Sequence, residues 1–253
     1  DGGLNWRLVH SNTRPGVFYD AMDVLGPFMV IVGDPFKIEA LGIQQFDLIA
    51  SQDSGETWNK DFTSTWAGFW EADSGEAFFA ASGGNIQLDY KGRFDPLHPD
   101  YKKLRYTMVS GGLNSRYYSM GTRIGLQYPS CPSCGAYAHR RASNRRVVIV
   151  GGNYLKPDQK ESVCLYYDTA SHSLQWSEIP PGGYRSGVDE YRNGELWVCT
   201  GTNGSDLSLD NGKTWKALPI GGYNACDFSS QYLWLCGNKG SVKRVAITSL
   251  TQP

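Results

Sequence analysis

At 253 residues the chain has the length of a single all-β domain. Its formal net charge of −1 gives no electrostatic basis for binding nucleic acid, and no apolar run is long enough to span a membrane. We therefore expect neither a nucleic-acid partner nor membrane insertion. The 30 glycines, 12 prolines and 13% aromatic residues favour many short strands joined by tight turns.

The chain opens on the first copy of a short repeated element. In full the element reads S-x-D-x-G-x-T-W, and residues 51–58 and 208–215 match it at every defined position. Residues 1–6 are the same element without its opening serine, and residues 168–176 are a degenerate copy with an insertion before its tryptophan. The aspartate accepts backbone N–H groups across a tight turn, the glycine takes a positive φ, and the tryptophan is predicted to pack between neighbouring sheets. The defining residues are Asp1, Gly3, Trp6, Asp53, Gly55, Trp58, Asp210, Gly212 and Trp215.

Groups of about four strands follow one another at the period of a β-propeller. If each repeated element joins the third and fourth strands of a blade, four complete blades are predicted. They comprise residues 18–24, 28–33, 46–52 and 57–62; 77–88, 105–110, 116–120 and 125–128; 135–141, 146–151, 162–168 and 174–179; and 186–191, 195–200, 206–209 and 214–218.

The last predicted blade has only three strands, at residues 225–229, 232–237 and 241–247. Residues 6–10 are predicted to supply its fourth strand, because a ring closed by both termini leaves no exposed sheet edge. The sequence thus predicts one all-β domain over residues 1–253, a β-propeller with five visible blades. If upstream sequence has been lost, six or seven blades are expected.

The six cysteines favour an oxidising compartment, so we expect a secreted or periplasmic protein. Cys131 and Cys134 form a lone CxxC without a second pair at zinc-finger spacing, which predicts a small loop disulfide and no zinc. Cys199 and Cys236 lie in the similar settings LWVC and LWLC, as a bridged pair or as buried thiols on equivalent strands. No metal is expected, because the histidines lack ligand spacing, and no cofactor is expected, because no nucleotide fingerprint occurs.

Ligands of propellers meet the entrances of the innermost strands, which narrows the search for a site. A Pro-Pro-Gly-Gly turn delivers Tyr184 and Arg185 to one such entrance, where a ring face and a bidentate guanidinium would suit a carboxylate or sulfate on an acidic glycan. Asp20, Glu76 and Asn224, from neighbouring strand entrances, are the predicted companions. No residue is assigned a catalytic role.

The repeated element resembles the Asp box, or BNR repeat, of sialidase-like propellers. Residues 18–22, 33–35, 75–83, 151–154 and 181–186 are similar to a group of secreted bacterial Asp-box propellers loosely labelled oxidoreductase or glycosyl hydrolase. A more distant resemblance is to the photosystem II assembly factor propellers, which bind protein. The Arg-Ile-Pro motif of sialidases is missing, and Arg123-Ile124-Gly125 does not replace it.

The resemblance implies a secreted or periplasmic module that binds a protein or a glycan. The alternative is a carbohydrate-active enzyme, a glycoside hydrolase or polysaccharide lyase, with acidic residues and Arg185 at the mouth of the channel. An enzyme requires two carboxyl groups, or a tyrosine and a carboxylate, that converge in an open pocket.

Overall fold

A computed structural model describes residues 1–59, 71–95, 99–119 and 122–251. The protein is all-β, and none of the antiparallel sheets formed by these residues closes into a barrel. A single α-helical turn, α1 (Ile247–Leu250), follows the last strand. Among the described residues, no helix has the length and apolar character needed to cross a membrane.

The first two sheets come from the N-terminal half of the chain. The first contains β1 (Tyr19–Leu25), β2 (Phe28–Ile38), β3 (Ile43–Ser51) and β4 (Glu71–Ala72). The second contains β6 (Ile86–Tyr90), β7 (Leu104–Val109), β9 (Arg116–Ser119) and β10 (Thr122–Gly125).

Three further sheets complete the described fold. The third contains β11 (Cys134–Arg141), β12 (Arg146–Asn153), β13 (Cys164–Asp168) and β14 (Ser173–Trp176), extended beyond β11 by β8 (Gly111–Gly112) and β5 (Glu76–Ala77). The fourth contains β15 (Gly187–Tyr191), β16 (Leu196–Gly201), β17 (Gly204–Ser208) and β18 (Lys216–Leu218). The fifth contains β19 (Ala225–Phe228), β20 (Tyr232–Cys236) and β21 (Val242–Ala246).

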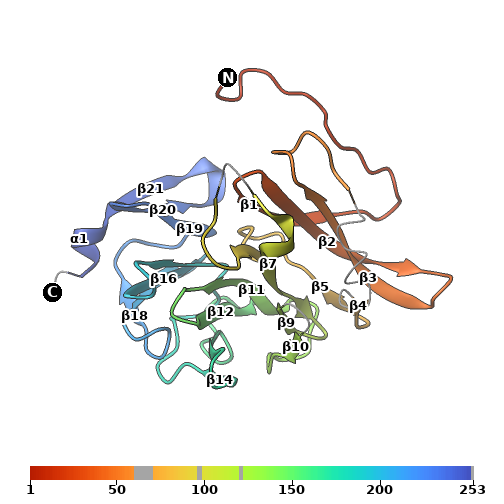
Figure 1. Cartoon of the computed structure of the whole chain (residues 1–253). Helices are drawn as coiled ribbons and strands as arrows, with labels where there is room; N and C mark the ends of the chain where they lie inside the picture. The colour runs from red at the N-terminus through yellow and green to blue at the C-terminus, as the bar shows by residue number, and fades with distance from the viewer. Residues whose placement is uncertain (60–70, 96–98, 120–121, 252–253) are drawn as a thin grey trace.

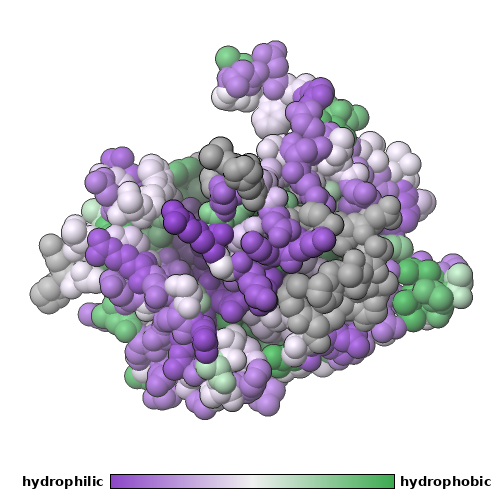
Figure 2. Space-filling view, viewed as in Figure 1, coloured by the Kyte–Doolittle hydropathy of each residue, from purple (hydrophilic) through white to green (hydrophobic). Residues whose placement is uncertain are grey.

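The sheets follow one another as a fan, from the first sheet at the right of Figure 1 to the fifth at its left. One strand of each sheet, namely β1, β6, β11, β15 and β19, contacts the corresponding strand of the next sheet in this order. We call these five the inner strands. Most of the face seen in Figure 2 is hydrophilic, with a hydrophobic patch at the tip of the β2–β3 hairpin, where Leu41 is exposed.

Apolar layers fill the spaces between consecutive sheets. Val30 and Leu48 of the first sheet pack with Met108 of the second, and equivalent layers join the second sheet to the third, the third to the fourth and the fourth to the fifth. The middle sheets are therefore covered on both faces. Strand β16 accordingly has six buried residues in succession, whereas burial alternates along β20.

The inner strands are also joined by polar contacts. In each of these strands except the last, β19, a polar side chain at the equivalent position contacts the next inner strand. Asp23 accepts the backbone N–H of Leu88 at 2.6 Å. Gln87 accepts that of Arg141 at 2.7 Å. In each case a side chain of one inner strand binds the backbone of the next, so the series fixes neighbouring sheets to one another near the centre of the fan.

The same position continues through the remaining inner strands. Arg140 pairs with Asp189, its Nε 2.9 Å from Oδ1, and Asp189 accepts the backbone N–H of Phe228 at 2.7 Å. Asp227 is the equivalent residue of β19, because it lies opposite Trp234 as Asp189 lies opposite Val198. It is exposed.

The two complete S-x-D-x-G-x-T-W elements form the same turn. Asp53 accepts the backbone N–H of Thr57 at 2.9 Å, and Asp210 accepts that of Thr214 at 2.9 Å. The surroundings of the tryptophans differ. Trp215 is buried in the layer between the third and fourth sheets, whereas Trp58 is only half-buried, on the face of the first sheet that no described sheet covers.

The prediction that residues 6–10 complete the last sheet is wrong, because no strand forms there and the fifth sheet contains only β19, β20 and β21. Asp1 instead folds a turn of its own, accepting the N–H groups of Gly3 and Leu4, and Trp6 is 91% exposed. Arg7 pairs with Glu56 of the repeated element at residues 51–58, so the N-terminal segment lies against the first sheet, at the opposite end of the fan from the fifth (Figure 1).

The strand expected over residues 77–88 divides into β5, which belongs to the third sheet, and β6, which belongs to the second. The strand expected over residues 57–62 falls mostly outside the described residues, and within them Asn59 forms one bridge to Ala50.

The cysteines follow the predictions in part. Cys131 and Cys134 form a disulfide, as predicted. Cys199 and Cys236 are both free, the first buried and the second exposed. The similar sequences LWVC and LWLC do not occupy equivalent positions. Cys199 lies opposite Val188 of β15. On β19 the residue equivalent to Val188 is Cys226, and Leu235, not Cys236, lies opposite it. A shift of one residue moves a side chain to the other face of a sheet.

Candidate functional site

A cavity of about 460 Å³ lies where the first, third, fourth and fifth inner strands begin. Polar and aromatic side chains from loops and strand ends share its wall. Three of the five predicted ligand-binding residues, Asp20, Tyr184 and Asn224, line this cavity. The remaining lining residues are Phe18, Asp34, Phe78, Phe79, Ala80, Ala81, Tyr137, Tyr154, Ser186, Thr202 and Asn238.

Both acidic residues of the cavity occupy β-bulges. Asp20 is the extra residue where the pairing of β1 with β2 shifts, and Asp34 is the extra residue where the pairing of β2 with β3 shifts. A bulge changes the direction of a side chain and is frequent beside functional sites. Gly33 permits this close approach of β1 and β2, since a Cβ at that position would lie 2.2 Å from the carbonyl oxygen of Phe18.

The two carboxyl groups hold a proton more tightly than ordinary aspartates. Burial, followed by the negative charge of Asp34, raises the pKa of Asp20 to about 7, although backbone groups of Ala80 and Asp34 partly offset this. Burial also raises the pKa of Asp34. In the described structure, Oδ2 of Asp20 and Oδ1 of Asp34 are enclosed without a hydrogen-bond partner. A proton retained by this pair near neutral pH lowers the cost of burying two carboxyl groups together.

Aromatic rings form a connected cluster on the wall of the cavity. The rings of Phe79 and Tyr137 stack with centroids 4.2 Å apart, and Tyr184 meets Tyr137 edge to face at 4.8 Å. Tyr137 and Tyr184 are buried, whereas Phe18 and Tyr154 are exposed at the rim. The cluster therefore provides both a fixed wall and accessible ring faces for a ligand.

The prediction that Arg185 joins Tyr184 at the site is wrong in position. Arg185 is buried and paired with Asp206, to which its Nε donates a hydrogen bond at 2.7 Å. Its Nη1 donates to the side chain of Asn203 and to the carbonyl oxygen of Tyr184. Consecutive residues of an extended chain point to opposite sides, so Tyr184 faces the cavity while Arg185 enters the fourth sheet.

Glu76 also lies apart from the cavity. Its carboxylate accepts hydrogen bonds from Tyr118 at 2.6 Å and from Arg116 at 2.5 Å, and a further one from Ser110. The side chain is buried, and the bonds from Tyr118 and Arg116 tie β5 to β9 of the second sheet. Glu76 is thus a structural residue in this fold.

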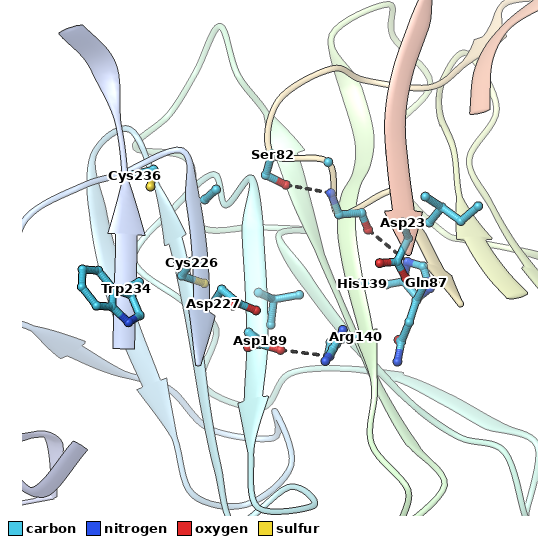
Figure 3. Close-up of a pocket in the computed structure, with 15 residues that line it drawn as sticks. Asp23, Ser82, Gln87, His139, Arg140, Asp189, Cys226, Asp227, Trp234 and Cys236 are labelled. Atoms are coloured by element: carbon cyan, nitrogen blue, oxygen red, sulfur yellow. Dashed lines mark hydrogen bonds and ion pairs between the residues drawn. The ribbon is translucent and has the colours of Figure 1, made fainter. Parts of the chain in front are cut away.

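A second, smaller pocket of about 250 Å³ lies farther along the inner strands (Figure 3). It is lined by the polar series that begins at Asp23 and ends at Asp227. Burial raises the pKa of Asp189 to about 6, against the opposing effect of Arg140. His139, bonded to Gly84 and Thr107, is buried, and its pKa falls to about 3, so it carries no charge at neutral pH. Except for Asp227, the members of this series already bind the neighbouring inner strand, so this pocket is a contact region between sheets.

No metal centre is indicated in the part of the chain that the structure describes. No group of three or more His, Cys, Asp or Glu side chains there is arranged to hold a metal ion.

Known proteins give little guidance. No family model and no curated protein sequence matches the chain. Among solved structures, the crystal structure of the computationally designed Ika4 protein is similar at a TM-score of 0.39 and 15% sequence identity, over 56% of this chain and 85% of that one. A likeness of this size carries no argument about fold or function.

Sequence reasoning missed Asp34, Tyr137 and Tyr154. Proline is unfavourable inside a strand except at edges and bulges, so Pro35 directly after Asp34 was a usable signal for the bulge. The two tyrosines had no such signal, because their approach to Asp20 depends on how the first and third sheets are placed in space.

Proposed function

We propose that this protein is an extracytoplasmic binding module for glycans, and that its ligand occupies the cavity lined by Asp20, Asp34 and the tyrosine cluster. We further propose that its sheets are blades of an Asp-box β-propeller. Three observations support this architecture. The inner strands contact one another in order, apolar layers lie between consecutive sheets, and the two S-x-D-x-G-x-T-W elements form the same turn.

One observation carries the glycan proposal. The connected rings of Phe79, Tyr137 and Tyr184 line the same cavity as carboxyl and amide side chains. Sugar rings present C–H faces that pack on aromatic side chains, and their hydroxyl groups require hydrogen-bond partners of fixed direction. Binding sites in general combine an apolar wall with a few placed polar groups. Asn224, whose side chain bonds Asn238 at 3.1 Å, extends this polar edge.

The disulfide supports a location outside the cytoplasm. Cys131 and Cys134 are bonded on the loop that leads into β11, and disulfides persist in oxidising compartments. The four free cysteines are Cys164, Cys199, Cys226 and Cys236, of which only Cys236 is exposed. Burial raises the pKa of the first three thiols, which protects them from oxidation there.

The test is binding of a panel of neutral and amino-substituted oligosaccharides, measured by titration calorimetry. Tyr154→Ala removes an exposed ring from the rim and should weaken binding at least tenfold without changing the melting temperature. Leu155→Ala is the matched control, because Leu155 is the next residue, is 67% exposed and does not line the cavity. Absence of binding by every oligosaccharide, or equal loss in both variants, would contradict the proposal.

The paired carboxyl groups favour a second candidate function, that of a carbohydrate-active enzyme. A carboxyl group that keeps its proton up to about pH 7, next to a second carboxyl group, is the arrangement that general acid–base catalysis uses. Asp20 would then donate the proton and Asp34 would act as the base. Release of reducing ends from an oligosaccharide, abolished in Asp20→Asn while binding persists, would replace the binding module by the enzyme.

A further inference from the structure

The charges of the cavity are one-sided. Its described lining contains two carboxyl groups and no lysine, arginine or histidine. The cation expected there, Arg185, is committed to Asp206 inside the fourth sheet. An anionic sugar would therefore meet negative charge without compensation, which reverses the preference for carboxylate or sulfate that the sequence suggested.

Among the described residues, one oxygen of each carboxyl group also lacks a hydrogen-bond donor. Oδ2 of Asp20 and Oδ1 of Asp34 are enclosed and without a partner in the described structure, and enclosed acceptors of this kind are rare. Their positions at two adjacent bulges, fixed by the close approach at Gly33, keep the pair together at the wall of the cavity. A ligand group that donates several hydrogen bonds and carries positive charge would remove the need for a retained proton.

The aromatic cluster also favours a positively charged ligand group, through the faces of its rings. The faces of aromatic rings carry partial negative charge and attract cations. Tyr184 and Tyr137 are buried against each other, and Tyr154 approaches Tyr137 with centroids 6.5 Å apart, so several rings border the space beside the acids. Rings and carboxyl groups in one cavity are the elements from which proteins build sites for ammonium groups.

We propose that the ligand of this cavity carries a protonated amine, and that it is a glycan of unacetylated 2-amino sugars whose ammonium group lies between Asp20 and Asp34. This inference rests on the proposed glycan function and narrows it to one class of sugar. Acetylation of the same amine removes the charge and adds bulk, so it should abolish the preference.

The experiment compares two tetrasaccharides of identical linkage, one of glucosamine and one of N-acetylglucosamine, with a neutral glucose tetramer of the same linkage. At about pH 6.5 the glucosamine tetramer should bind at least tenfold more tightly than the other two. Asp20→Asn and Asp34→Asn should each remove most of this preference, measured as the ratio of the affinities for the glucosamine and glucose tetramers. Asp227→Asn is the control, because it removes one carboxylate that is exposed and does not line the cavity.

Titration in two buffers of different ionisation enthalpy gives an independent measurement. Binding of the ammonium group should release protons from the acid pair at about pH 6.5, and Asp20→Asn should reduce this release. Equal or tighter binding of the acetylated or neutral tetramer overturns the amine while leaving the glycan site in place. Failure of all three tetramers to bind overturns both.

Discussion

Asp189 on β15 accepts the backbone N–H of Phe228 on β19 at 2.7 Å. Asp227 stands at the position on β19 equivalent to Asp189, and in the described structure no further inner strand lies beside it. The same residue type at equivalent positions thus has a bonded and an unbonded copy, which allows a direct measurement of what the contact contributes.

Replacing Asp189 with alanine should lower the free energy of unfolding by about 1–3 kcal/mol, because the N–H of Phe228 and the guanidinium of Arg140 lose their buried partner. Asp227→Ala should change it by less than about 0.5 kcal/mol, as for most exposed positions. Urea denaturation of the two variants measures both values. Equal losses would show that the contact between sheets contributes nothing beyond the residue itself.

The acid pair of the cavity makes stability depend on pH. The folded-state pKa of Asp20, about 7, is above the unfolded value near 4, so the folded protein binds more protons between these limits. Its contribution to stability is present at low pH and is lost as pH rises from about 4 to about 7. Asp34, whose pKa is also raised, acts in the same direction. The slope of unfolding free energy against pH should be shallower in Asp20→Asn than in wild type, and an unchanged slope would refute the retained proton.

Arg185 should behave as a structural residue. Arg185→Ala leaves the buried carboxylate of Asp206 without its cation and should cost about 3–5 kcal/mol. The double replacement Arg185→Leu with Asp206→Leu removes both charges and should recover a large part of that loss. Thermal or urea unfolding distinguishes these outcomes. A stable Arg185→Ala protein with selectively weakened ligand binding would restore Arg185 to the site.

The two S-x-D-x-G-x-T-W elements allow a test of how much the aspartate of this turn contributes to stability. Asp210→Ala removes the acceptor of the Thr214 N–H and should destabilise the protein by about 1–3 kcal/mol, because Trp215, next along the turn, is held in the buried layer between two sheets. Lys213→Ala, at an exposed position of the same turn, is the control. Asp53→Ala should cost less, since its turn is exposed and Trp58 is half-buried. A larger loss at Asp53 would contradict this ranking.

The sequence predicted the sheets better than the site. Strand alternation and the S-x-D-x-G-x-T-W copies are local signals, so most strands between residues 135 and 246 form near the predicted positions. The pairing of β5 with the third sheet and the register of β20 are set by contacts between distant segments. Local pattern therefore could not reveal that Trp234 is equivalent to Val198 and not to Trp197.

The site shows the same division between local and distant information. Tyr184 and Asp20 could be placed at strand entrances from their neighbours in sequence. The commitment of Arg185 to Asp206 could not, because it depends on which face of the fourth sheet each side chain meets. Asp34 was concealed for a similar reason, since its importance comes from a bulge that brings it beside Asp20.

Within the described structure, the first and fifth sheets are covered by a neighbouring sheet on one face only, and this affects how readily they unfold locally. Apolar layers join each sheet of the fan to its immediate neighbours, so stability should spread along the series much as in a linear array of repeats. Strands β12 and β16, covered on both faces, should have the slowest amide hydrogen exchange. The amides of β20, where Trp234 is 39% exposed on the uncovered face, should exchange by opening of the fifth sheet alone.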